Sequence, residues 1–308
     1  MIRADDAGKL VNSPAAAIAP ERRLIHVNGI EAALLTIDET PKGVRQMTFK
    51  DLIVHLDSRH RCAQRLDYAA RLAARSGAHL TGLYTLDFVP ALTELVHAYP
   101  ARTEQLEIYN RLRATELDRA KEAQQSFEEA LRREGLEGEW RLIEGPHAET
   151  AAVHAHYADL AIVGQIDPQD PPAINAERIP EAVLLGSGRP VLVVPYAGSF
   201  ATVGQRVLVA WTATAEAARS LADAMPLLQN AEKVTVLTVN PSRVVDAETG
   251  IPGADIAIHL ARHGVTVEVK TMIVDEITVG DTILNAAFDY GADLLVMGGY
   301  GPIRARVN

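Results

Sequence analysis

Short apolar runs alternate with helical patterns along most of the chain. Uninterrupted apolar runs predict buried strands, and apolar residues three or four apart predict amphipathic helices. From residue 51 onward, strands are expected at residues 52–56, 79–86, 139–143, 159–163 and 191–194, and helices at 60–76, 101–133, 146–157 and 181–185. Strands that alternate with helices imply right-handed βαβ units and a parallel sheet.

The pattern starts again after residue 200. Strands are expected at residues 206–211, 233–239, 265–270 and 294–297, and helices at 215–228, 256–263 and 280–290. The clearest internal match joins residues 157–164, Tyr-Ala-Asp-Leu-Ala-Ile-Val-Gly, to residues 291–298, Gly-Ala-Asp-Leu-Leu-Val-Met-Gly. Both segments put Ala-Asp before an apolar run that ends in glycine. We interpret the chain as a tandem duplication of one α/β unit.

The second copy is shorter than the first. The first continues past Gly164 through a helix and a fifth strand, whereas the second has ten residues after Gly298. We predict an α/β fold with two tandem Rossmann-like domains, residues 47–199 and 200–308, the second without its last helix and strand. Residues 1–46 form a separate extension, where Asn28-Gly29 between two β-prone runs predicts a hairpin. A partly disordered arm is the alternative there.

Composition and charge narrow the class of protein. Of the 308 residues 48% are hydrophobic and 23% charged, the balance of a soluble globular protein. A net charge of −10 argues against nucleic acid and anionic membranes as partners. Cys62 is the sole cysteine, which favours a reducing compartment, and apolar runs fall short of a membrane helix. We expect a cytoplasmic protein.

Three motifs carry a resemblance to a known family. They are residues 51–57, Asp-Leu-Ile-Val-His-Leu-Asp; residues 185–195, Leu-Gly-Ser-Gly-Arg-Pro-Val-Leu-Val-Val-Pro; and residues 292–301, Ala-Asp-Leu-Leu-Val-Met-Gly-Gly-Tyr-Gly. Over residues 47–308 the chain resembles the universal stress protein family, in its tandem two-domain form. The resemblance implies five-stranded parallel sheets with helices on both faces and dimer-like packing of the units.

The resemblance also implies a nucleotide site. In nucleotide-binding members, glycines in the pattern G-x2-G-x9-G-S/T and the helix that follows cradle the phosphates of ATP with backbone N–H groups. An acidic residue after the first strand and the backbone after the second hold the ribose and adenine.

In the first repeat this pattern is incomplete. Asp57 matches the acidic position, Gly164 the first glycine and Gly186-Ser187 the last pair. Asp167 stands where the second glycine is expected, and eighteen residues, twice the usual nine, separate it from Gly186. A carboxylate there repels phosphate. We predict that the first site is degenerate for ATP.

The second repeat has half of a phosphate cradle. Gly298 and Gly301 match G-x2-G, and Val239 matches the position after the second strand. Trp211 replaces the acidic residue and offers a stacking face instead. Two arginines, Arg304 and Arg306, could lie near phosphates. Candidate nucleotide-binding residues are thus Gly298, Gly301, Val239, Asp57, Gly164, Gly186 and Ser187, with ATP as a possible ligand.

No convincing catalytic or metal-binding constellation is found. Only His147 and His154 of the three histidines His147, His154 and His156 share a helix face, so we interpret them as incidental. His55 is interpreted as a core histidine, and Cys62 as a half-buried packing residue, although a helix start can lower a thiol pKa. Ser187 precedes a strand, the wrong context for a nucleophile elbow.

We therefore expect a stress-response module that binds a ligand or partner and is not an enzyme. The alternative is a dimerising scaffold without nucleotide, whose duplicated domains bury one another and whose sites are vestigial. A weak ATP hydrolase is the least favoured interpretation. Self-association or domain–domain packing is expected in each case.

Overall fold

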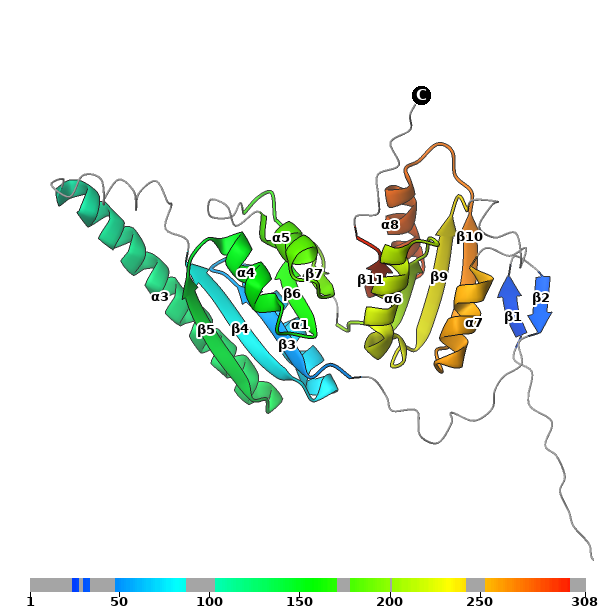
Figure 1. Cartoon of the computed structure of the whole chain (residues 1–308), viewed down its shortest axis with the longest axis horizontal. Helices are drawn as coiled ribbons and strands as arrows, with labels where there is room; N and C mark the ends of the chain where they lie inside the picture. Colours follow the sequence, from blue (N-terminus) through cyan, green and yellow to red (C-terminus); the bar gives the residue numbers. More distant parts are fainter. Residues whose placement is uncertain are drawn as a thin grey trace, which may run out of the picture. The chain divides into compact units, whose positions relative to one another are not determined.

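The computed structural model describes residues 24–27, 30–33, 48–86, 103–170, 178–199, 201–241 and 253–299. The chain divides into two compact units, Met1–Val44 and Arg45–Asn308. In the first unit, β1 (Leu24–Val27) and β2 (Ile30–Ala33) pair antiparallel, with Val27 opposite Ile30 (Figure 1). This pairing agrees with the predicted hairpin, whose turn residues Asn28 and Gly29 lie outside the described residues.

The first repeat of the second unit forms a five-stranded parallel sheet in the order β5-β4-β3-β6-β7. Its strands are β3 (Asp51–Leu56), β4 (His79–Leu86), β5 (Gly138–Glu144), β6 (Leu160–Gly164) and β7 (Val191–Val194). Its helices are α1 (Cys62–Ser76), α3 (Thr103–Glu134), α4 (His147–Ala155) and α5 (Ile179–Gly186). The parallel α/β prediction is confirmed for this repeat.

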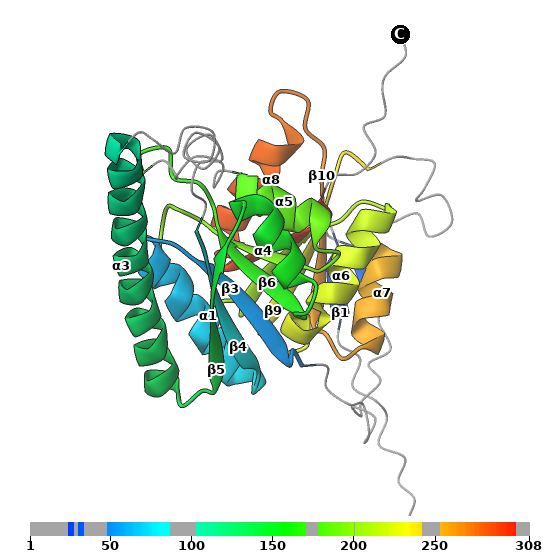
Figure 2. The same ribbon diagram turned by 60° about the vertical axis from the view of Figure 1, so that its left-hand side comes forward.

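Helices cover both faces of the first sheet, as Figure 2 shows for α3 beside α1 and for α4 with α5. Leu52 and Val54 of β3 pack with Leu66 of α1 and Phe127 of α3 on one face. Ile53 points to the opposite face, toward α4 and α5. Alternate residues of one strand therefore fill two cores, which explains the uninterrupted apolar run.

The second repeat forms a four-stranded parallel sheet in the order β10-β9-β8-β11. Its strands are β8 (Arg206–Ala210), β9 (Lys233–Val239), β10 (Val267–Met272) and β11 (Leu294–Met297). Its helices are α6 (Ala215–Leu228), α7 (Ala254–Arg262) and α8 (Val279–Asp289). Among the described residues this sheet has no counterpart of β7, which agrees with the smaller second sheet predicted.

A connector, residues 201–205, leads from the first repeat into β8. Thr202 Oγ1 donates a hydrogen bond to Asp293 Oδ2 at 2.7 Å. Val203 and Leu294 pack against the core of the first repeat, and Leu294 also packs against a core of the second. The described part of the chain has no helix that is both long enough and apolar enough to cross a membrane.

Candidate functional site

Polar side chains gather where the strands of the first sheet end at their carboxyl edge. Asp57 directly follows β3, and Gly164 ends β6, the neighbouring strand. Arg65 of α1 lies between them. In open α/β sheets this edge is where ligands bind, so this is the first candidate site.

Arg65 fills the space that a ligand would need beside the two predicted site residues. Its Nη2 donates a hydrogen bond to Asp57 Oδ2 at 2.8 Å. A Cβ built on Gly164 would lie 2.0 Å from Arg65 Nη1, so the guanidinium rests directly on the glycine. Arg65 is buried, and its Nε has no hydrogen-bond partner within the described structure.

The ion pair between Asp57 and Arg65 keeps both side chains charged. Burial alone would raise the pKa of Asp57, but Arg65 opposes it and holds the pKa below its usual value. Burial likewise works to lower the pKa of Arg65, and the Asp57 carboxylate outweighs it. Cys62 Sγ accepts a hydrogen bond from Asp57 N at 3.4 Å. Burial raises the pKa of the Cys62 thiol, which gives no support to an activated thiolate.

A second polar chain crosses the same edge of the sheet. Thr85 Oγ1, near the end of β4, lies 2.6 Å from His147 Nδ1 and 3.5 Å from His55 Nε2. All three side chains are buried. Burial lowers the pKa of His55 to about 3, so this histidine is neutral at physiological pH. The packed interior around it agrees with its interpretation as a core histidine.

The loop after β6 is bound to the loop after β3. His60 Nδ1 lies 2.8 Å from Asp170 Oδ2, and His60 Nε2 lies 3.7 Å from Asp167 Oδ2. The carboxylate that replaces the second glycine of the motif therefore already faces a basic partner in the chain.

Gly186 and Ser187, the last pair of the motif, end α5 and contact other groups. A Cβ on Gly186 would lie 3.3 Å from Ala152 Cβ, and Gly186 O lies 2.9 Å from His156 Nε2. Ser187 is buried, and its Oγ accepts a hydrogen bond from Arg189 N at 3.2 Å. These contacts describe a helix end packed on α4.

In the second repeat, the first turn of α6 occupies the room beside Gly298. A Cβ built on Gly298 would lie 2.7 Å from Ala217 N and 2.8 Å from the carbonyl carbon of Glu216. Thr214 caps this helix, since its side chain accepts a hydrogen bond from Ala217 N at 3.3 Å. Gly298 is therefore required by the close approach of the helix. Gly301, Arg304 and Arg306 lie outside the described residues.

The remaining second-repeat candidates lie at the ends of β8 and β9. Trp211 is half-buried against the apolar core, and its backbone N–H donates to Leu237 O at 2.9 Å. Val239 is half-buried at the end of β9. The next residue, Asn240, has a φ of 47° and is fixed by two hydrogen bonds of 2.8 Å with the backbone of Val274. The backbone after this strand is thus held in one unusual conformation.

The three histidines of 147–156 do not converge. His147 faces Thr85, His156 faces Gly186 O, and burial lowers the pKa of the half-buried His154. In the described ranges no group of three or more His, Cys, Asp or Glu residues could hold a metal ion.

Arg65 and Thr85 were absent from the predicted site residues. The sequence contains a signal that could have identified Arg65 as a buried residue. Arg65 precedes Ala69 and Leu72 at helical spacing, on a helix stripe that is otherwise apolar. A basic residue on a buried stripe requires a buried partner. Which partner it takes depends on the tertiary fold.

Solved structures show which fold this is. A universal stress protein from Archaeoglobus fulgidus DSM 4304 aligns with 82% of this chain and 86% of its own, at a TM-score of 0.57 and 17% identity. The chain has the universal stress protein fold. Two sheets of like topology, one of five strands and one of four, make it a tandem arrangement of that fold.

Shorter proteins with the universal stress protein fold match one half of the chain. UspA from Lactobacillus plantarum covers 48% of this chain with 99% of its own, at 20% identity and a TM-score of 0.37. A universal stress protein from Archaeoglobus fulgidus, solved in complex with dAMP, covers 48% with 99% of its own, at 19% identity and a TM-score of 0.32. Neither the models of protein families nor the curated proteins gave a match.

Proposed function

We propose that this chain is a stress-response protein of the cytoplasm that acts by binding a ligand or a protein partner and is not an enzyme. In this proposal, adenine nucleotide binds at most weakly, and it binds in the second repeat. The sole cysteine and the acidic composition support the cytoplasmic setting. The universal stress protein fold supports the proposed role in the stress response.

The observation that carries the proposal is the position of Arg65. Its guanidinium is paired with Asp57 and rests on Gly164, so both predicted contacts of the first site are taken by the chain itself. A nucleotide there would have to break this ion pair, in which Arg65 is buried and Asp57 partly exposed, at a cost of about 1.5–3 kcal/mol. The first repeat therefore does not fit ATP.

The second repeat offers part of a site. Trp211 provides an aromatic face at the end of β8, and the Asn240 bonds hold the backbone after β9. The first turn of α6 packs against Gly298 and Thr214 caps its Ala217 N–H, so this helix start offers an anion its dipole and not that N–H group. No acidic residue takes the place of Asp57 there. Binding with a Kd of about 1 mM, or about −4 kcal/mol, is expected from so few contacts.

Equilibrium dialysis of ATP, ADP and AMP against the full chain tests the proposal. Trp211→Ala is expected to weaken binding about tenfold, while Asp57→Asn leaves it unchanged. A loss confined to Asp57→Asn would place the nucleotide in the first repeat and overturn the argument from Arg65. Absence of binding at millimolar nucleotide would remove the nucleotide part and leave the partner-binding part.

A second candidate function is a scaffold without nucleotide. A Cβ on Gly299 would lie 3.3 Å from Leu184 Cδ2 of α5, so the first repeat contacts the glycine turn of the second. Close packing therefore accounts for both Gly298 and Gly299 without a ligand, as expected if the site is vestigial. In this case nucleotide leaves the melting temperature of the wild-type chain unchanged, and self-association, measured by sedimentation, is the functional readout.

A weak ATP hydrolase is the least favoured candidate. Turnover of ATP that depends on Mg²⁺ and is lost in Trp211→Ala would establish it against our proposal. Activity unaffected by that substitution would indicate a contaminant.

A further inference from the structure

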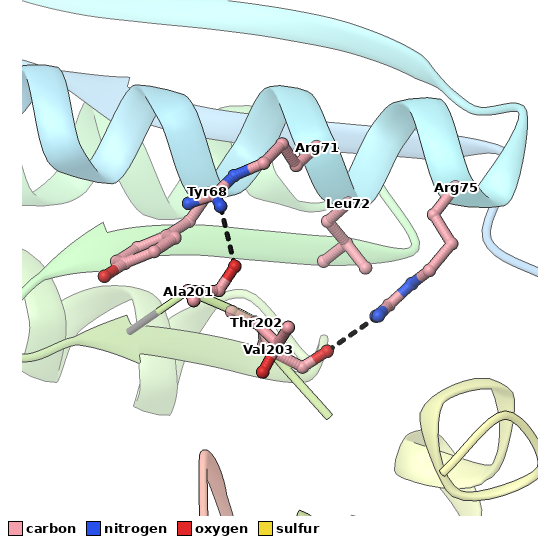
Figure 3. Close-up of a pocket in the computed structure, with 7 residues that line it drawn as sticks. All are labelled: Tyr68, Arg71, Leu72, Arg75, Ala201, Thr202 and Val203. Atoms are coloured by element: carbon pink, nitrogen blue, oxygen red, sulfur yellow. Dashed lines mark hydrogen bonds between the residues drawn. The ribbon is translucent and has the colours of Figure 1, made fainter. Parts of the chain in front are cut away.

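A pocket of about 180 Å³ lies between α1 and the connector, away from the sites described above. Its lining is Tyr68, Arg71, Leu72, Arg75, Ala201, Thr202 and Val203 (Figure 3). Apolar side chains and backbone make most of the wall, and two arginines four residues apart on one helix supply the charge. A concave, mostly apolar site with a few polar groups is the usual form of a small-ligand site.

Both arginines are held in place by the connector. Arg71 Nη1 donates to Ala201 O and Arg75 Nη1 donates to Val203 O, each at 2.8 Å (Figure 3). Arg71 also donates through Nε to Asp67 O at 3.3 Å and lies over the Tyr68 ring, 5.1 Å from its centroid. A guanidinium carries five N–H donors. Several donors on each arginine therefore stay available to a ligand.

The charge around the pocket is not balanced. Within the described residues neither Arg71 nor Arg75 forms an ion pair, and the nearby Asp67 carboxylate is taken by Arg133 at 2.6 Å. Burial lowers the pKa of Arg75, and Asp293 is the one carboxylate that opposes this effect. Arg71 and Arg75 are exposed residues, so an anion from the solvent can reach their guanidinium groups.

Asp293 does not supply that counter-ion, because its oxygens are already used. They accept hydrogen bonds from the connector and the start of β8, namely Thr202 Oγ1, Gly204 N, Gln205 N and Arg206 N. Of the two nearby carboxylates, Asp67 is paired with Arg133 and Asp293 accepts these four hydrogen bonds, so neither forms an ion pair with the two guanidiniums.

We propose that this pocket binds a small oxyanion, phosphate or carboxylate, between the guanidiniums of Arg71 and Arg75. Planar guanidinium groups bind such anions in a bidentate way. Since Arg71 and Arg75 also donate hydrogen bonds to the connector, the anion stabilises the connector against α1. The pocket adjoins the segment that precedes β8, at the amino end of the second sheet. It is therefore separate from the carboxyl-end turn considered for nucleotide, and it does not depend on nucleotide binding.

Phosphorus NMR of inorganic phosphate, titrated with the full chain at constant ionic strength, tests the proposal. Line broadening is expected to saturate for the wild type and to be lost in R71Q/R75Q, with affinity down about tenfold or more. Arg219→Gln is the matched control, since Arg219 is an exposed arginine of α6 paired with Asp223 at 2.8 Å. It should bind phosphate as the wild type does.

Acetate and AMP distinguish the sources of the anion. Displacement of phosphate by acetate indicates a general oxyanion site. Displacement by AMP that persists in Trp211→Ala assigns the AMP phosphate to this pocket and keeps the result apart from the proposed nucleotide site. Displacement by neither restricts the site to inorganic phosphate.

A pocket-filling variant covers the case in which R71Q/R75Q fails to fold. Ala201→Leu keeps both arginines and the Ala201 carbonyl but fills the space, so it should abolish phosphate binding. Phosphate binding of wild-type strength in either R71Q/R75Q or Ala201→Leu would overturn the proposal. So would broadening that never saturates, because non-specific salt effects behave that way.

Discussion

The carboxylates of Asp159 and Asp293 occupy matching places in the two repeats, and both accept hydrogen bonds from the backbone where the first strand begins. Asp159 Oδ2 accepts from Lys50 N at 2.7 Å and from Asp51 N at 3.1 Å. Asp293 accepts from three backbone N–H groups of residues 204–206 at 2.9 to 3.1 Å. The repeated Ala-Asp of the sequence therefore has a structural cause, since it ties the fourth strand to the first.

Replacing Asp293 by alanine should destabilise the chain more than replacing Asp159. Asp293 accepts an additional hydrogen bond from Thr202 Oγ1. A hydrogen bond to a charged group contributes up to about 3 kcal/mol to stability. We expect a loss of about 3 kcal/mol for Asp293→Ala and about half of that for Asp159→Ala, measured by urea unfolding. Asp293→Asn keeps the shape and should lose less. Equal losses at the two positions would contradict this account.

The order of elements and the duplication could be predicted from sequence because they depend on local periodicity. The strand before Gly298 was located at 294–297, where β11 lies. The strand expected at 265–270 instead begins two residues later, at Val267. Val265 N donates to Leu260 O in the turn that ends α7, and the residue is buried there. The alternation of Val265, Val267 and Val269 with polar residues predicts a strand, but it does not show at which residue the preceding turn ends.

The content of the first site could not be predicted in the same way. Asp57 and Gly164 were located by motif, but a motif does not show that Arg65, eight residues after Asp57, folds back between them. The direction of a long side chain is set by the burial of its helix face and by a partner from another element. Such contacts have no local signature.

Breaking the Asp57–Arg65 pair from the arginine side should be strongly destabilising. Arg65→Met leaves the Asp57 carboxylate without its cation. Because the Asp57 side chain is 25% exposed, we expect a loss of about 1.5–3 kcal/mol, less than for a fully buried pair. The double variant Asp57→Asn, Arg65→Met should lose less than the sum of the two single losses. Denaturant unfolding of all four proteins measures the coupling. Additive losses would show that the pair is not coupled in solution.

Gly298→Ala should destabilise the chain even when no nucleotide is present. The new methyl group would meet the backbone of Glu216 and Ala217 at 2.7 to 2.8 Å, and backbone cannot move aside cheaply. We expect a loss of about 1–3 kcal/mol or more in thermal unfolding. Gly280→Ala is the control, because its nearest neighbour is Thr278 Oγ1 at 3.8 Å. Wild-type stability of Gly298→Ala would leave a ligand as the remaining reason for the glycine.

The stability of the chain should fall with acidification because of His55. Burial lowers the pKa of His55 from 6.5 to about 3, while Asp57 raises it and Arg65, His147 and Arg59 add to the lowering. Between these two values the unfolded chain binds a proton that the folded chain does not. The free energy of unfolding therefore decreases as the pH falls below 6.5, by up to about 1.4 kcal/mol per pH unit.

His55→Gln should flatten this dependence between about pH 6 and 4.5, because glutamine does not titrate. Urea unfolding at several pH values measures the slope for the wild type and the variant. His259→Gln, which removes an exposed histidine of α7, is the control and should keep the wild-type slope. Carboxylates begin to protonate in the unfolded chain near pH 5, but all three proteins carry the same carboxylates, so the difference between their slopes isolates His55. A slope that is equal in His55→Gln and the wild type would mean that His55 is hydrated in solution, and the buried His55–Thr85–His147 chain would then be wrong.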